Sequence, residues 1–362
     1  MSGLLSVGDI IGGRYEVRYD IGEGGMQFVY AAHDRLTDRL VALKTPKNRS
    51  ATKRFRRSAI VAARVNHPNV AKTLDYLKVE EQRFLIEELI EGDDLAGALL
   101  KDTRFIDPYL AAKILHHLAK GVAAAHHAGV IHRDLKPSNV MVVGGYSLAE
   151  LKITDFGIAK LAGEELEEAA AGGEASLSMS QTAVGALPYM APEAIDTPKE
   201  VTAAADIWSL GAMIYHLMCG EAPYGTGLRA VRNILEAKRP NVPAFLTANP
   251  QFAPLASEVI DIALSCLMRD PFDRPTADDL VTRCSQLCYT SSPRRRGKVS
   301  RIFYGSYGFI DTNLGDVFFH MECVYGATPL SMGDTVMFSS YEGGGAPRAL
   351  PVVKLLKNDR SL

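Results

Sequence analysis

Two short segments carry acidic and amide side chains at spacings that suit phosphate chemistry. HRDLKPSN (132–139) contains Asp134 and Asn139, and the segment DFG follows with Asp155. A carboxylate such as Asp134 can accept or orient the proton of an attacking hydroxyl, and Asn139 and Asp155 offer hard oxygen ligands for Mg²⁺. These residue types predict a site that transfers a phosphoryl group.

A glycine-rich segment near the N-terminus could hold the phosphates. DIGEGGMQFVY places Gly22, Gly24 and Gly25 in a turn between two expected strands, where backbone N–H groups can approach a polyphosphate. Lys44, at the end of the expected strand VALK, could direct a cation toward the same phosphates. A glycine-rich hairpin turn with no ligand is the alternative for the glycines taken alone.

Two regions of different character must position these residues. Residues 10–90 are rich in short β-type segments, with one helical stretch around 53–65, and residues 95–288 show apolar side chains every three or four positions. A β-rich lobe followed by a helical lobe is therefore expected, with the chemistry between them.

Six segments in this order resemble the signature set of protein kinases: the glycine loop, VALK, HRDLKPSN, DFG, APE and DIWSLG. The resemblance covers about residues 10–288 and implies an ATP- and Mg²⁺-dependent enzyme with protein substrates. It implies catalytic roles for Asp134, Lys136 and Lys44, and metal binding by Asn139 and Asp155. Lys136, two residues after Asp134, is the family's mark of serine/threonine specificity.

The resemblance also assigns a nucleotide pocket and three structural residues. In the family, Glu193 and Arg274 form an ion pair, and Asp206 braces the catalytic loop. The nucleotide-binding positions are Ile21, Gly22, Glu23, Gly24, Gly25, Val29, Ala42, Lys44, Glu88, Ile90 and Met141.

The chain departs from the kinase pattern beside the strand lysine. Where the family carries a glutamate that pairs with this lysine, the residue is Ser58, and the position before the hinge is Glu87 instead of an apolar residue. We expect Glu87 to supply the carboxylate to Lys44; a solvated, outward-pointing Glu87 is the alternative. Gln27 replaces the third loop glycine, and Ala186 replaces a threonine that is usual in the family. Each change removes a residue that assists catalysis in the family.

The segment after DFG is rich in small and hydroxyl side chains and is expected to form a mobile activation loop. Its candidate phosphorylation sites, including sites of autophosphorylation, are Ser176, Ser178, Ser180 and Thr182. Arg133 could receive the phosphate. A solvated serine-rich loop without a regulatory role is the alternative.

A basic segment, residues 289–296, is expected to link the kinase-like region to a small domain over residues 297–355. This domain resembles a cold-shock domain, a five-stranded OB-type barrel, through SYGFI and VFFH. The rings of Tyr307, Phe309, Phe318 and His320 could stack on unpaired bases. Lys298 and neighbouring arginines could hold the phosphates.

The cold-shock resemblance is imperfect, and a barrel core is the alternative for its rings. Ile310, Val317 and Phe319 lie on the opposite phase and are expected in the core. Arg301 and Ile302 occupy positions where the family has two aromatic residues that stack on bases. The expected affinity for single-stranded RNA or DNA is therefore lower.

Composition supports a folded globular protein, and the two resemblances imply an α+β fold: a bilobal kinase-like region followed by an all-β OB-type barrel. The chain has 362 residues, 47% of them hydrophobic, and a net charge of −2. No apolar run is long enough for a membrane span, and we expect a cytoplasmic protein. The alternatives to an active kinase that binds nucleic acid are a weakly active nucleotide-binding scaffold and an active kinase whose barrel docks proteins.

Overall fold

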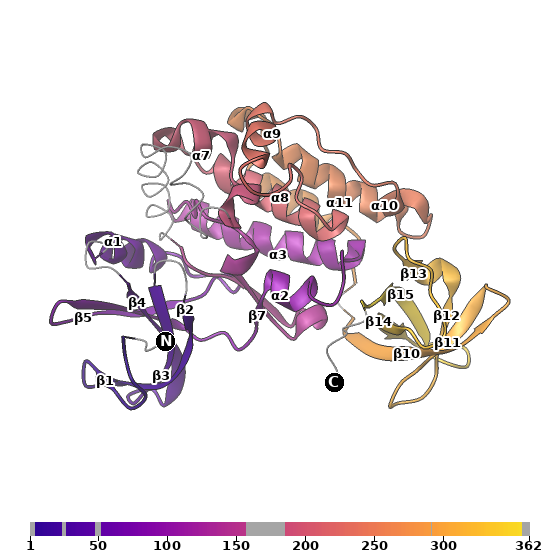
Figure 1. Cartoon of the computed structure of the whole chain (residues 1–362), viewed down its shortest axis with the longest axis horizontal. Coiled ribbons are helices and arrows are strands. Elements are labelled where there is room, and N and C mark those ends of the chain that lie inside the picture. Colours follow the sequence, from indigo (N-terminus) through magenta and orange to yellow (C-terminus); the bar gives the residue numbers. More distant parts are fainter. Residues whose placement is uncertain (1–3, 24–26, 48–51, 157–184, 291, 357–362) are drawn as a thin grey trace.

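The computed structural model describes residues 4–23, 27–47, 52–156, 185–290 and 292–356. A sheet-rich lobe, a helical lobe and a small barrel follow one another along the chain (Figure 1). The predicted succession of a β-rich lobe and a helical lobe is confirmed.

The sheet-rich lobe is built on a six-stranded sheet with the order β1-β2-β3-β4-β6-β5. One helix, α1 (Thr52–Ala62), packs on it by inserting Phe55 and Ala59 against Leu85. The strands are β1 (Ile10–Ile11), β2 (Tyr15–Glu23), β3 (Gln27–Asp34), β4 (Arg39–Pro46), β5 (Thr73–Val79) and β6 (Gln82–Glu88).

The helical lobe is centred on α3 and α8, whose side chains are mostly buried. Asp107 caps the start of α3 and Pro108 occupies its first position, where a missing N–H costs nothing. The helices are α2 (Leu95–Leu99), α3 (Pro108–His127), α7 (Pro192–Asp196), α8 (Ala204–Cys219), α9 (Ala230–Glu236), α10 (Phe245–Ala248), α11 (Ala253–Cys266) and α12 (Ala277–Ser285). A small sheet joins β7 (Asp93–Asp94), β8 (Val140–Val143) and β9 (Glu150–Ile153).

The C-terminal strands form a closed barrel, because the antiparallel order β12-β11-β10-β14-β15 is completed by a parallel pairing of β12 with β15. Along β12, buried Val317 and Phe319 alternate with partly exposed Phe318 and His320, as a strand with one face in the core requires. The strands are β10 (Arg294–Phe303), β11 (Tyr307–Asp311), β12 (Val317–His320), β13 (Val324–Tyr325), β14 (Thr335–Tyr341) and β15 (Arg348–Lys354).

Strand β10 corrects the predicted linker. The run Arg294–Arg296 belongs to β10 and pairs with β14, so it is part of the barrel and not of a connection. Composition suggested a linker because basic runs are usually solvated, but the Arg294 side chain is only 5% exposed. The connection between α12 and the barrel is therefore residues 286–293.

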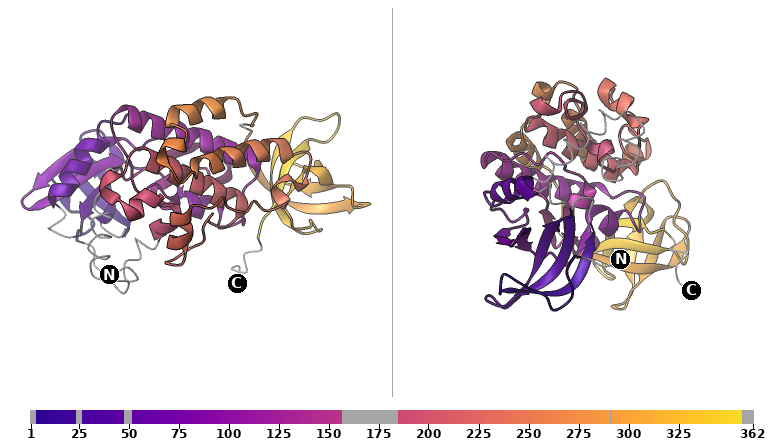
Figure 2. Two further views of the ribbon diagram at one scale, coloured as in Figure 1. Left: turned by 90° about the horizontal axis from the view of Figure 1, so that it is seen from above. Right: turned by 60° about the vertical axis from the view of Figure 1, so that its left-hand side comes forward.

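The barrel packs against the helical lobe at the end remote from the sheet-rich lobe (Figures 1 and 2). Tyr325 of β13 makes ring contacts with Phe105, Phe245 and Phe252 of the helical lobe, with centroids 5.2 to 6.3 Å apart. Arg294 donates to both carboxylate oxygens of Asp107 at 2.8 Å. These contacts join a buried aromatic cluster to a buried ion pair, which holds the barrel in place.

Candidate functional site

A cavity of about 440 Å³ lies between the sheet-rich lobe and the helical lobe. It contains every predicted nucleotide-binding position that the structure describes: Ile21, Gly22, Glu23, Val29, Ala42, Lys44, Glu88, Ile90 and Met141. Gly24 and Gly25 lie outside the described residues. The sequence had not singled out other lining residues, among them Ala71, Asp93, Asp94, Ser138 and Thr154, because no motif marks them.

Lys44 lies between two carboxylates at the back of this cavity. Its Nζ is 2.6 Å from Glu87 Oε2 and 2.6 Å from Asp155 Oδ1. Lys44 is 7% exposed and Glu87 3%, so this is a buried charged cluster. The expected pairing of Glu87 with Lys44 is present, and the alternative of an outward-pointing Glu87 is wrong.

Burial and pairing act in opposite directions on these ionisable groups. Burial raises the pKa of the Glu87 carboxyl above its ordinary value, and Lys44 offsets only part of this effect. Burial also opposes the charge of Lys44, but Asp155 and Glu87 outweigh it and hold the ammonium pKa above its usual value. The pKa of Asp155 stays below its ordinary value because Lys44 and Gln27 outweigh its burial.

Gln27 contacts Asp155, which lines the cavity, whereas the sequence suggested only the loss of a residue that assists catalysis. Its Nε2 donates to Asp155 Oδ1 at 3.1 Å, and the residue is 7% exposed. Its Oε1 is buried without a hydrogen-bond partner among the described residues. A side chain in place of the loop glycine therefore adds a contact to the carboxylate expected to bind the metal.

The catalytic segment brings the predicted base and its neighbours together. Asp134 Oδ2 lies 2.8 Å from Lys136 Nζ and accepts a hydrogen bond from Asn139 Nδ2 at 3.1 Å. Because its nitrogen faces Asp134, Asn139 has its carbonyl oxygen left as an acceptor. That amide oxygen and the carboxylate of Asp155 form a donor set of hard oxygens, which fits Mg²⁺.

Asp206 holds the backbone of the catalytic segment. Its two oxygens accept hydrogen bonds from the backbone N–H groups of His132 and Arg133, both at 2.8 Å. Arg133 has a φ of 68°, a left-handed conformation that needs such support. His126 Nε2 lies 2.9 Å from Asp206 Oδ2 and adds a third contact.

The expected ion pair between Glu193 and Arg274 is present. Arg274 Nη1 and Nη2 donate to the two Glu193 oxygens at 2.6 and 2.9 Å. The guanidinium also lies 5.0 Å from the ring centroid of buried Trp208, which is within the distance of about 6 Å that defines a cation–π contact. The pair fixes the helical lobe and does not touch the cavity.

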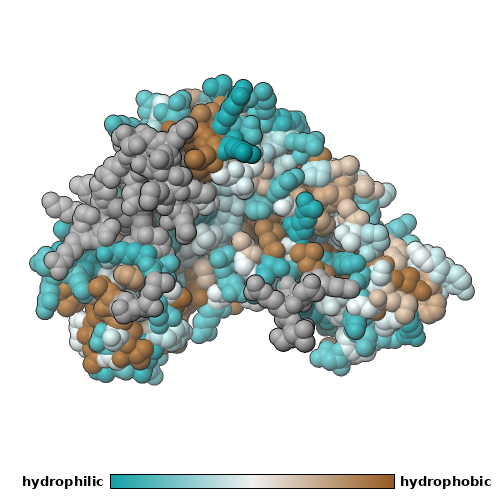
Figure 3. All heavy atoms as spheres, in the orientation of Figure 1, coloured by the Kyte–Doolittle hydropathy of each residue, from teal (hydrophilic) through white to brown (hydrophobic). Residues whose placement is uncertain are grey.

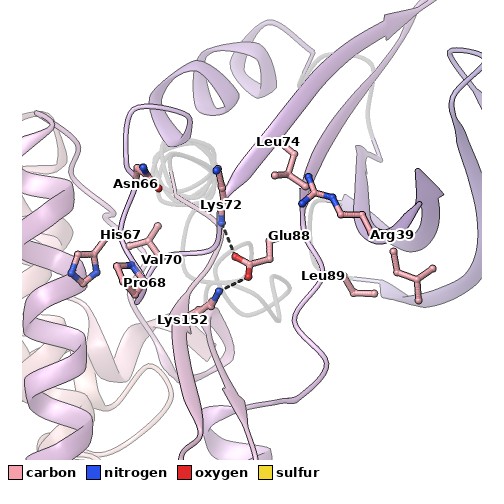
Figure 4. Close-up of a pocket in the computed structure, with 11 residues that line it drawn as sticks. Arg39, Asn66, His67, Pro68, Val70, Lys72, Leu74, Glu88, Leu89 and Lys152 are labelled. Carbon is pink, nitrogen blue, oxygen red and sulfur yellow. Dashed lines mark hydrogen bonds and ion pairs between the residues drawn. The ribbon is translucent and has the colours of Figure 1, made fainter. Parts of the chain in front are cut away.

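A second cavity of about 600 Å³ shares two lining residues with the first, Glu88 and Leu89, which belong to the predicted hinge (residues 88–90). Figure 4 shows the Glu88 carboxylate pointing into this second cavity, where it meets Lys152 and the backbone N–H of Lys72. The Glu88 side chain is therefore turned toward Lys152. We therefore expect Glu88 to contribute its backbone groups, and not its side chain, to the nucleotide cavity.

The predicted rings of the barrel lie together on one face. Tyr307 pairs with His320 and Phe309 with Phe318 across β11 and β12. The Phe318 ring centroid is 5.8 Å from those of Tyr307 and Phe309. Ile310, Val317 and Phe319 fill the core as expected, and a Cβ on Gly308 would meet the Phe319 ring at 2.7 Å. The alternative that all the rings form the core is wrong.

Phe303 and Arg301 extend this aromatic face. Phe303, which lies outside both cold-shock-like motifs, stacks on Tyr307 with centroids 5.4 Å apart. Arg301 lies 4.9 Å above the Phe309 ring and also pairs with Asp316, so it is part of the face. Figure 3 shows hydrophobic side chains at the barrel surface. Lys298 is exposed on β10, opposite Asp311.

The candidate phosphorylation sites Ser176, Ser178, Ser180 and Thr182 lie outside the described residues. Within the described ranges, no helix combines the length and apolar character that crossing a membrane requires. The same ranges hold no cluster of three or more histidine, cysteine or acidic side chains arranged for a metal ion.

Comparison with known proteins agrees with this geometry. The family described as "Protein kinase domain" matches residues 15–284. The chain is 30% identical to the probable serine/threonine-protein kinase PknB of Lactococcus lactis over 83% of its own length and 46% of the relative's. It is 33% identical to PknA of Corynebacterium glutamicum, over 76% of this chain and 57% of that one.

The similarity extends to PrkC of Bacillus subtilis, a serine/threonine-protein kinase, at 29% identity over 76% of this chain and 41% of the relative. The chain thus spans about half the length of the curated relatives it matches. The matched region contains both walls of the cavity, Lys44 and Glu87 on one side and the catalytic segment on the other. The chain therefore belongs to the protein kinase family.

Proposed function

We propose that this chain is a serine/threonine protein kinase that transfers the γ-phosphate of ATP, as its Mg²⁺ complex, to hydroxyls of protein substrates. Asp134 would orient the accepting hydroxyl, and Lys136 would neutralise charge that develops on the transferred group. Lys44 would bind the phosphates of ATP, and Asn139 and Asp155 would hold the metal.

One observation carries this proposal: Lys44 Nζ lies 2.6 Å from Asp155 Oδ1, and Asp134, Lys136 and Asn139 form a second cluster in the catalytic segment, whose Ser138 lines the cavity. Phosphoryl transfer depends on positioning and on stabilising negative charge, and these two clusters supply both. A protein that only binds nucleotide would have no need for a carboxylate held by a lysine and an amide.

The acceptor and the metal are tested together. The chain is incubated with labelled ATP and a generic basic protein, with Mg²⁺ or with excess chelator. We expect label on serine and threonine, lost with the chelator. Label on tyrosine would contradict the proposed specificity, and transfer that persists without a divalent metal would contradict the role of Asn139 and Asp155.

For the barrel, we propose an OB-type, cold-shock-like domain that binds single-stranded nucleic acid. The ring order β10-β11-β12-β15-β14, with β12 parallel to β15, supports the OB-type assignment. The partly exposed rings of Phe303, Tyr307, Phe309 and Phe318 support a role in stacking. Base–aromatic stacking contributes about 1 to 3 kcal/mol per base.

Binding of a fluorescent single-stranded RNA to the full chain tests this function. The variant Tyr307→Ala/Phe318→Ala should bind at least about tenfold more weakly, because two stacking rings are lost. Tyr304→Ala is the matched control: Tyr304 lies at the tip of the same hairpin, 95% exposed, and has no ring contact among the described residues.

The outcome separates the remaining candidates for the barrel. Equal RNA affinity of the wild-type chain and the double variant would contradict stacking on this face. If the wild-type chain does not bind single-stranded RNA or DNA at any salt concentration, the face is left as a docking surface for proteins.

A further inference from the structure

Lys44, Glu87 and Gln27 lie on one face of three neighbouring strands, β4, β6 and β3, whereas Asp155 follows β9 of the small sheet. In the register of β4 and β6, Lys44 lies opposite Leu85 and Ala42 opposite Glu87. Side chains two residues apart on a strand share a face, so Glu87 is a diagonal neighbour of Lys44, within reach of a long side chain. On the other side, Val29 lies opposite Lys44, which places Gln27 diagonally across from the lysine on β3.

Helix α1, which covers the same face, has no acidic residue to offer. Its sequence TKRFRRSAIVA contains four cations and no aspartate or glutamate. Through Phe55 and Ala59 it contributes apolar packing against Leu85. No position or rotation of this helix can therefore bring a carboxylate to Lys44.

We propose that Glu87 and Gln27 are positioning residues that take over the task of a helix glutamate, Glu87 by holding Lys44 and Gln27 by holding Asp155. We call these four residues the sheet clamp. Because Lys44, Glu87 and Gln27 all belong to the sheet, the clamp forms without a contribution from α1. A shift of α1 would therefore leave the ion pair of Lys44 intact.

Metal binding would explain why two carboxylates surround one lysine. With Mg²⁺ held by Asp155, the charge of this carboxylate would be shared with the metal, and Glu87 would be the carboxylate left to balance Lys44. Gln27 has an amide to orient Asp155 and a buried Oε1 without a partner among the described residues. An uncharged side chain at this position can support Asp155 without competing for the cation.

The inference is tested with Glu87→Met, which places an apolar side chain of similar length at the buried site. Affinities for ATP and for adenosine are measured on the full chain, together with kcat and KM for ATP. We expect ATP affinity and kcat to fall about tenfold or more, with adenosine affinity not reduced, because only ATP has phosphates for Lys44 to bind. A general loss of structure would weaken both ligands.

Glu87→Gln, nearly identical in shape, serves as the second variant if Glu87→Met does not fold. Glu16→Gln is the matched control, because Glu16 lies on β2 of the same sheet and pairs with Arg35 away from the cavity. ATP affinity and kcat within about twofold of wild type in the folded Glu87 variant would overturn the role of Glu87.

Gln27 is tested by its effect on the metal. Gln27→Leu should raise severalfold the Mg²⁺ concentration that gives half-maximal ATP binding, because Asp155 loses its orienting donor. An unchanged Mg²⁺ requirement would overturn the role of Gln27. Only the expected changes in rate rest on the proposed function. If the wild-type chain transfers no phosphate, the kinase proposal fails, but the measurements of ATP, adenosine and Mg²⁺ binding still test the sheet clamp.

Discussion

Buried ionisable side chains shape both the nucleotide cavity and the core around α3. Lys44 and Glu87 are tolerated inside because each neutralises the other, and removing one partner would leave an uncompensated charge. A buried histidine without an acidic partner is instead favoured in its neutral form, because burial disfavours the charged imidazolium. On α3, His117 Nδ1 lies 2.9 Å from Asn69 Nδ2. This amide nitrogen can only donate, so Nδ1 of the ring must be unprotonated to accept the hydrogen bond.

The buried His117 should make stability depend on pH. Burial, with the charges of Lys113 and Lys120, lowers its pKa to about 4, well below the value of 6.5 expected in the unfolded chain. The unfolded state therefore binds the proton first as pH falls. The free energy of unfolding should drop by up to about 3 kcal/mol between pH 7 and pH 4.

Urea unfolding of the wild-type chain and of His117→Gln at several pH values checks this. Glutamine can accept the Asn69 hydrogen bond but does not titrate, so the variant should lose less stability on acidification. His67, His116 and His216 also have pKa values lowered by burial, and a residual slope is expected. Parallel pH profiles of the two proteins would contradict the role of His117.

Among single residues, the sequence predicted the pairing of Lys44 and Glu87 because a missing helix glutamate left a charge to be balanced. It did not predict Gln27 or Phe303. A β-bulge between Val299 and Arg301 shifts the register of β10 against β11, which changes the side chains that reach the aromatic face. Such local irregularities are not visible in the periodicity of the residues.

At the scale of elements, α3 connects the barrel to the catalytic segment. Its first turn is capped by Asp107, which also pairs with Arg294 of β10. Its last turn carries His126, which contacts Asp206 beneath the catalytic segment. Helix α3 is therefore fixed at one end by the barrel and at the other by the group that supports Asp134.

Arg294→Ala should destabilise the full chain by about 3 kcal/mol, because Asp107 remains buried without its cation. Arg296→Ala is the matched control. Arg296 is the second residue after Arg294 on the same strand, is 59% exposed, and pairs with Asp102 at 3.4 Å. We expect a cost of about 0 to 1 kcal/mol for this exposed pair. Equal unfolding free energies of the two variants would contradict the importance of the buried pair.

The element-scale predictions were right for the lobes and wrong for the basic segment. Hydrophobic periodicity is a property of each element, and it correctly placed a β-rich lobe before a helical lobe. Composition could not reveal that Arg294 is buried, since its partner Asp107 is far away in sequence. Contacts between domains depend on such distant pairs, so the packing of barrel against helices was not predictable.

At the scale of the whole molecule, the docked barrel and the sheet-rich lobe lie at different ends of the helical lobe (Figure 1), and the nucleotide cavity is lined by residues of the sheet-rich and helical lobes. The cluster around Tyr325 and the ion pair of Arg294 are buried in the interface, whereas the aromatic face stays partly exposed. The barrel can therefore be held by one surface while another remains accessible to a ligand. The kinase region and the proposed nucleic-acid site form one assembly in this arrangement.

The most direct test of the account is the initial rate of phosphate transfer from labelled ATP by the full chain, compared with Asp134→Asn. Asparagine keeps the shape of the side chain but cannot accept the proton of the attacking hydroxyl. We predict measurable transfer by the wild-type chain and a rate at least about 100-fold lower in the variant. No transfer by the wild-type chain, or equal rates for both proteins, would contradict a catalytic site centred on Asp134.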